Sequence, residues 1–155
     1  MTNLTQKEQL LLQDQKSHEE LCIKKYTNYA NQSNDPQLKQ IFLNNAQEEQ
    51  EHLNSINQLL SGQIPNVNSQ QNNQQQQNPQ MQPGTGTGLE SKNDADLCTD
   101  LLATEKYVSS TYDTAIFEFR DPNIRNVLNH IQKEEQQHGE AIYKYMESKG
   151  MYNPQ

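Results

Sequence analysis

The chain has little apolar material, no tryptophan and few cysteines. Of its 155 residues, 31% are hydrophobic and two are cysteine. Two cysteines are too few for a disulfide framework, so we expect synthesis in a reducing, intracellular compartment. A core with so few apolar side chains must be narrow, and a four-helix bundle is the architecture that closes around it. At this length the chain forms one domain, or two half-domains that pack on each other.

Basic residues are also scarce. Lysine and arginine number 12 against 20 aspartate and glutamate, which leaves a net charge of −8. Nucleic acids and anionic membranes are polyanions, so this charge argues against both as partners and suits a protein that concentrates cations. No apolar run approaches membrane-spanning length, and no N-terminal stretch has the basic start and apolar centre of a signal peptide. We therefore expect a protein made in the cytoplasm without a signal peptide.

One set of residues occurs twice, with the second copy 86 positions after the first. Each copy contains a glutamate on an upstream helical stretch and a Glu-x-x-His motif on the next. The motif places its two side chains on one helix face. Two such copies form the ligand set of a ferritin-like di-iron or di-manganese carboxylate site. The first copy is Glu19, Tyr26, Asp35, Pro36, Glu48, Glu49 and His52, and the second is Glu105, Tyr112, Asp121, Pro122, Glu134, Glu135 and His138.

Capping signals divide the chain into two helical hairpins. A capping box at Thr5 opens a first helix that runs to about residue 33. Asp35-Pro36 and Asp121-Pro122 each place an N-cap before a proline at the first helical position. They predict a second helix that ends near residue 60 and a fourth that ends at residues 149–150. Asp94 is expected to cap the third helix, which continues to about residue 120.

The predicted fold is an all-α, ferritin-like four-helix bundle built from these two hairpins. Residues 1–60 form the first hairpin, residues 61–93 a Gln/Asn/Gly-rich low-complexity linker, and residues 94–155 the second hairpin. The linker has no apolar periodicity and therefore nothing to bury. Helices of roughly 27 residues are about 40 Å long. A linker of this length spans about 30 Å as a coil and can stretch further, so it permits a crossover along the bundle.

The candidate ligands interrupt the apolar faces of the helices, at the same level along the two helices of each hairpin. Glu49 and His52 lie between Phe42 and Ile56, on the face that the apolar residues of the helix occupy. Glu19 and Glu49 are equally distant from the turn at residues 34–35, so the folded hairpin brings them level. The second copy has the same spacing around residues 120–121. If the hairpins pack about a pseudo-two-fold axis, four glutamates and two histidines meet in one layer.

We predict that this layer binds two divalent metal ions, iron or manganese. Burying four carboxylates together is prohibitive unless protons or cations neutralise them. A ligand set rich in oxygen, with one imidazole for each metal, suits iron or manganese better than structural zinc. The alternative is that these are ordinary surface residues of an acidic helical protein, which two matched copies make improbable by chance. The predicted ligands are Glu19, Glu49, His52, Glu105, Glu135 and His138.

Further repeated residues lie beside the predicted ligands. Tyr26 and Tyr112 each follow the upstream glutamate by seven residues, on the same helix face. They could hydrogen-bond the second glutamate or act in redox chemistry, but we favour core tyrosines with satisfied hydroxyl groups. Glu48 and Glu134 could either support the ligands from outside or form a solvated face. His130, which has no counterpart in the first copy, is interpreted as a surface residue.

Residues 94–152 resemble the spore coat F family. The similarity lies in the DLL-x-TEK start, Tyr112, the run Asp121-Pro122-Asn123-Ile124-Arg125, Glu134-Glu135-Gln136, and the ending Lys149-Gly150-x-Tyr152. Met151 stands where the family usually has tryptophan. The resemblance implies a ferritin-like bundle made during sporulation by an endospore-forming bacterium and deposited in the spore coat. Relatives do not uniformly keep histidine at the position of His138, and its presence here is similar to rubrerythrins and manganese catalases.

Two functional hypotheses follow. In the first, the protein is a spore coat or coat-associated structural protein whose partners are other coat proteins or further copies of itself. In the second, it is a di-metal oxidoreductase of peroxidase, catalase or ferroxidase type that protects against oxidative stress. Glu49 and Glu135 would then bridge or chelate the metals, Glu19 and Glu105 would each bind one, and the histidines would complete the ligand sets. We favour the coat role, with metal binding as a property of the bundle.

Overall fold

A computed structural model of the protein describes residues 2–67 and 91–152. Four helices make up the described part of the chain, and no strand occurs within it. They are α1 (Gln6–Gln32), α2 (Pro36–Leu60), α3 (Ser91–Glu118) and α4 (Pro122–Ser148). The predicted all-α four-helix bundle is therefore confirmed. The predicted low-complexity linker lies mostly outside the described residues.

The helix ends follow the predicted capping signals. Thr5 Oγ1 accepts the amide of Glu8 at 3.1 Å, and the Glu8 carboxylate accepts the amide of Thr5 at 2.7 Å, which completes the capping box. Asp35 accepts the amide two residues ahead at 2.9 Å, and Asp121 does the same at 2.8 Å. After α4 the chain turns at Gly150, whose φ of 69° is a left-handed conformation that favours glycine.

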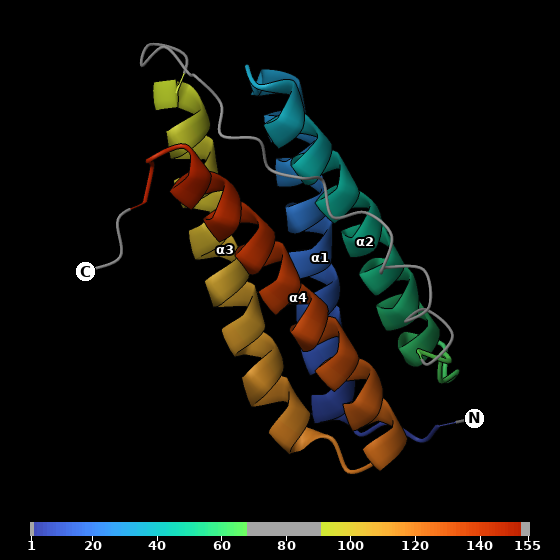
Figure 1. Cartoon of the computed structure of the whole chain (residues 1–155). Helices are drawn as coiled ribbons and strands as arrows, with labels where there is room; N and C mark the ends of the chain where they lie inside the picture. Colours follow the sequence, from blue (N-terminus) through green and yellow to red (C-terminus); the bar gives the residue numbers. More distant parts are fainter. Residues whose placement is uncertain (1, 68–90, 153–155) are drawn as a thin grey trace.

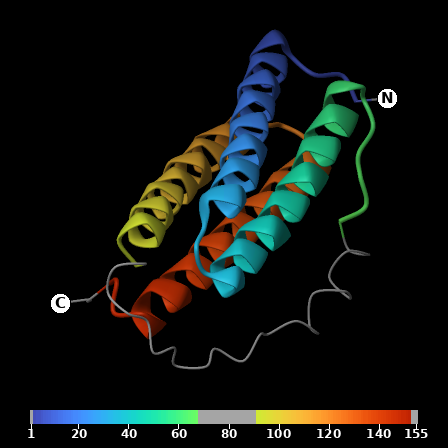
Figure 2. The ribbon, with the colours of Figure 1, turned by 90° about the horizontal axis from the view of Figure 1, so that it is seen from above.

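The two hairpins pack in the arrangement that the repeat predicts. α1 packs on α2, α3 packs on α4, and the hairpins meet through the pairs α1–α3 and α2–α4. The end of α2 and the start of α3 lie at opposite ends of the bundle (Figure 1). Hydrogen bonds agree, because Thr2 donates to Gly62 at one end and Asn34 donates to Asp94 at the other. Viewed from above, α1 lies beside α3 and α2 beside α4, as in a ferritin-like bundle with one long crossover (Figure 2).

α3 begins at Ser91, before the predicted cap at Asp94, and Asp94 performs a different task. Its carboxylate accepts the amides of Asn34 and Asp35 at 3.0 and 3.1 Å, in the turn of the first hairpin. Glu8, 86 positions earlier, accepts the amide of Arg120 at 3.1 Å in the turn of the second hairpin. Each hairpin therefore uses an acidic residue near its own start to hold the turn of the other. The short-range capping pattern could not show this long-range contact.

Glu8→Gln is expected to destabilise the protein by about 2 kcal/mol at neutral pH, because a buried charge-assisted hydrogen-bond network is lost. Burial acts to raise the pKa of Glu8, but hydrogen bonds from Thr5 and Arg120 outweigh it and lower that pKa from 4.5 to about 2. The folded-state pKa is depressed, so this stability is present above pH 4.5 and is lost as the pH falls toward 2.

Denaturant unfolding at stepwise lower pH measures this difference between parent and variant. The matched control is Glu118→Gln, which removes an exposed carboxylate that pairs with Lys7 at 2.8 Å. We expect the control to change stability by less than about 1 kcal/mol. A Glu8→Gln effect that stays constant from neutral to acidic pH would contradict the assigned role of the charge.

The core lies along the apolar faces of the four helices. Ile23 and Leu53 are only half-buried, and Cys22 is fully buried beside Ile23. Both cysteines are buried and unpaired, so Cys22 behaves as a small hydrophobic side chain. The largest fully buried side chains include Tyr26, Phe42, Ile56, Tyr112, Leu128, Ile131 and Tyr145.

Candidate metal centre

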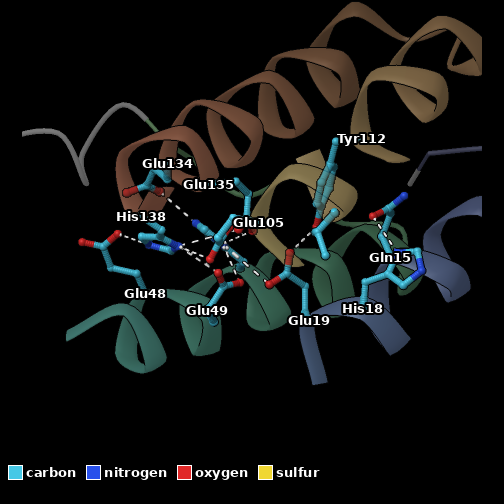
Figure 3. Close-up of polar contacts among 12 residues, drawn as sticks. Gln15, His18, Glu19, Glu48, Glu49, Glu105, Tyr112, Glu134, Glu135 and His138 are labelled. Carbon is cyan, nitrogen blue, oxygen red and sulfur yellow. Dashed lines mark hydrogen bonds and ion pairs between the residues drawn. The ribbon is translucent and has the colours of Figure 1, made fainter. Parts of the chain in front are cut away.

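Six buried side chains meet in the middle of the bundle, and they are the six predicted ligands. α1 and α3 each contribute one glutamate, while α2 and α4 each contribute a Glu-x-x-His pair (Figure 3). None of the six is more than 3% exposed. They form two overlapping groups in which the possible ligand atoms lie within 4.8 Å of one another. One group is Glu19, Glu49, His52 and Glu135, and the other is Glu49, Glu105, Glu135 and His138.

Glu49 and Glu135 belong to both groups, so each could contribute to two ions. Each histidine turns Nδ1 toward this shared pair. His138 Nδ1 lies 2.8 Å from Glu49, and His52 Nδ1 lies 3.1 Å from Glu135. The shortest Nδ1 contact of each ring is thus to the shared glutamate of the other hairpin. The two rings stack with centroids 5.7 Å apart.

The outer nitrogens of the histidines are held by Glu48 and Glu134. His138 Nε2 lies 2.6 Å from Glu48, which is on the far side of the ring from Glu49 (Figure 3). His52 Nε2 lies 3.2 Å from Glu134. A carboxylate behind a metal-binding imidazole sets the ring orientation and raises its basicity. Of the two alternatives left open for these glutamates, the structure therefore supports contact with the ligands over a solvated face.

Tyr26 and Tyr112 also connect the two hairpins. Tyr26 donates a hydrogen bond to Glu105, and Tyr112 donates one to Glu19, each at 2.5 Å. Both rings are fully buried, and burial followed by the neighbouring carboxylate charge raises their pKa values well above 10. The hydroxyl groups are thus protonated donors that orient the non-bridging glutamates. This agrees with the interpretation as core tyrosines with satisfied hydroxyl groups.

Burial shifts the protonation of the cluster. Burial, reinforced by the Glu19 charge, raises the pKa of Glu49 to about 7. Burial and the Glu135 charge raise the pKa of Glu105 to about 8. Burial alone would lower the pKa of both histidines, yet the surrounding carboxylates outweigh it and raise them. The metal-free cluster therefore retains protons at neutral pH, and metal binding must displace them.

Buried oxygen atoms that accept no hydrogen bond within the described part of the chain indicate that this set of residues fits two divalent ions. Glu19, Glu105 and Glu135 each have a buried oxygen, Oε2, that receives no hydrogen bond from any described residue. A buried, unsatisfied carboxylate oxygen is costly, and a cation satisfies it. Oxygen ligands with one imidazole in each group match the preferences of iron and manganese.

Comparison with known proteins places the second hairpin in a family. Residues 93–155 match the Coat F domain. The chain is also 34% identical, over 83 residues, to a Bacillus subtilis (strain 168) protein named Uncharacterized protein YusN. That match covers 54% of this chain and 73% of the relative. The chain belongs to the Coat F family. No solved structure matches it.

The Coat F region contains α3 and α4 except for the first residues of α3, and so contributes Glu105, Glu135 and His138. The other half of the cluster, on α1 and α2, lies outside the matched region. The buried site of this Coat F protein therefore requires both hairpins. Across the described residues, no helix combines the length and apolar character needed to cross a membrane.

His130 was interpreted as a surface residue, but the structure shows that its side chain is largely buried. Its side chain is only 10% exposed, and Nε2 lies 2.7 Å from Glu134, the residue that holds His52. The signal in the sequence was the four-residue spacing from His130 to Glu134, which places both on one helix face. The repeat did not indicate it, because His130 has no counterpart in the first copy.

A cavity of about 490 Å³ between α3 and α4 reaches the buried cluster. Glu105 and Glu135 are among its lining residues, together with Leu102, Ser109, Gln132 and Gly139. Gln132 is held in place by a 2.8 Å hydrogen bond to the carbonyl oxygen of Ser109. Space that is open to solvent therefore lies between α3 and α4, next to two of the candidate ligands.

Proposed function

We propose that this protein is a spore-coat-associated protein whose bundle holds two iron or manganese ions. Membership of the Coat F family supports the coat association. The observation that carries metal binding is the pair of ligand groups sharing Glu49 and Glu135, with buried oxygens left unsatisfied. Its partners in the coat would be other coat proteins or further copies of the chain.

In this proposal Glu49 and Glu135 would contribute ligands to both ions. Glu19 and His52 would complete one ligand set, and Glu105 and His138 would complete the other. Glu48 and Glu134 fix the imidazole orientation, while Tyr26 and Tyr112 fix the non-bridging carboxylates. Metal ions would replace the protons that the cluster otherwise retains.

Metal analysis combined with spore fractionation tests this proposal. The untagged protein should contain about two iron or manganese ions per chain, as its two ligand groups predict. Peptide mass spectrometry should find the protein in the coat extract of purified spores of the source bacterium. An abundant protein in vegetative cells that is missing from spores would exclude the coat role. A protein that stays free of metal after anaerobic reconstitution would exclude the metal site.

The cavity against Glu105 and Glu135 favours a second candidate, a di-metal oxidoreductase. Bound iron or manganese would supply the redox chemistry for peroxide or ferrous iron, which the chain's own side chains cannot. Peroxide consumption or ferrous-iron oxidation by the reconstituted protein, lost in Glu49→Gln plus Glu135→Gln, would support this candidate. Equal rates in parent and double variant would exclude it.

A further inference from the structure

At two positions, the cavity between α3 and α4 is lined by residues smaller than their repeat counterparts. Ser109 and Gly139 line it, and the residues 86 positions earlier are Ile23 and Leu53. The two hairpins contribute equivalent ligands, so a symmetric protein would have no reason to differ at these positions. The side chains of Ser109 and Gly139 are smaller than those of Ile23 and Leu53, so they leave space on one face of the site.

Gly139 is not explained by backbone conformation. It lies inside α4, and the described glycines with positive φ are Gly62 and Gly150. A Cβ atom at residue 139 would meet Leu102 Cδ1 at 3.6 Å, which is ordinary contact. Glycine inside a helix costs about 1 kcal/mol relative to alanine. Its consequence here is open volume toward the buried cluster.

Two buried carboxylate oxygens beside the cavity accept no hydrogen bond from the part of the chain that the structure describes. Glu105 and Glu135 line the cavity, and each has a buried Oε2 without a hydrogen-bond donor among the described residues. The two residues are only 3% and 1% exposed. The cavity therefore borders carboxylates that are almost completely buried.

We propose that this cavity admits a small, polar, metal-coordinating molecule from solvent to the di-metal site, through the face that Gly139 leaves open. The inference rests on the proposed metal site and adds to it the side of entry and the residue that controls it. The near-complete burial of Glu105 and Glu135 favours a small molecule such as peroxide or azide. The lining hydroxyl and amide groups, from Ser109, Ser110, Gln132 and Gln136, favour a polar ligand over an apolar one.

Azide binding to the cobalt(II)-loaded protein tests the proposal without relying on turnover. Cobalt(II) absorption reports both metal occupancy and any change in its ligands. Gly139→Leu places at this position the side chain that its repeat counterpart Leu53 carries. We expect it to bind as much cobalt as the parent and to bind azide about tenfold more weakly or worse. Ala103→Leu is the matched control, because Ala103 is exposed on α3 and does not line the cavity.

The possible outcomes distinguish a failure of the entry route from a failure of the metal site. Equal azide affinity in the parent and Gly139→Leu, at equal cobalt content, overturns the entry route and leaves the metal site standing. A parent protein that binds no cobalt overturns both. If Gly139→Leu loses cobalt or helical circular dichroism, Gly139→Ala and Ser109→Ile replace it, since each adds less volume. Azide affinity unchanged in both of these would also overturn the proposal.

Discussion

Replacing Glu49 and Glu135 together by glutamine is expected to abolish metal binding and the stability that metal confers. Both residues belong to each of the two ligand groups, so their loss removes two ligands from each ion. With free metal at about one hundred times the dissociation constant, binding stabilises the parent by about 3 kcal/mol. For a domain of this size that corresponds to a rise in Tm of about 6–12 °C, which the double variant should lack.

The metal-free Glu49→Gln single variant is expected to be at least as stable as the metal-free parent. Burial and the Glu19 charge raise the pKa of Glu49 to about 7, so ionising this carboxyl in the apo-protein opposes folding. A neutral amide of the same shape removes this unfavourable contribution. Scanning calorimetry of the parent, this single variant and the double variant, with and without manganese, gives the Tm values that the comparison needs.

Glu20→Gln with Glu140→Gln is the matched control, since it makes the same change of charge at two exposed helix positions. This control should keep both the metal content and the metal-dependent rise in Tm. A double variant of Glu49 and Glu135 that still gains stability from manganese would show that the ions bind elsewhere.

Phe42→Ala is expected to cost about 3–5 kcal/mol of unfolding free energy, because it leaves a cavity in a close-packed core. Phe42 is fully buried on α2, and its ring lies 5.9 Å from that of Tyr26. Tyr26 in turn holds Glu105, so the loss should also loosen one metal ligand. Denaturant unfolding measures the stability, and manganese titration of the folded variant should show weaker binding than in the parent.

Phe117→Ala provides the control for the same chemical change at the surface. Phe117 is 83% exposed on α3, so its truncation removes little packing. We expect an effect within about 0.5 kcal/mol and unchanged manganese binding. If the two variants lost equal stability, the burial assigned to Phe42 would be wrong.

Local patterns were sufficient to predict the helices and the composition of the buried cluster. The capping box at Thr5 and the two Asp-Pro pairs are satisfied by hydrogen bonds within three residues, so they can be read from adjacent positions. The Glu-x-x-His spacing depends only on helical periodicity. The start of α3 was less predictable, because Asp94 serves the turn of the other hairpin rather than its own helix.

By itself the sequence determined which residues share a helix face, and therefore which glutamates and histidines could meet. The tertiary structure determines which of these side chains contact each other between the hairpins. Antiparallel packing of α1 on α3 and of α2 on α4 pairs Tyr26 with Glu105 and His138 with Glu48, across the hairpins. It also brings Glu134 to His52 and leaves the face at Gly139 open. Helical periodicity is a local property of the backbone, whereas contacts between helices depend on how four of them are rotated and aligned together.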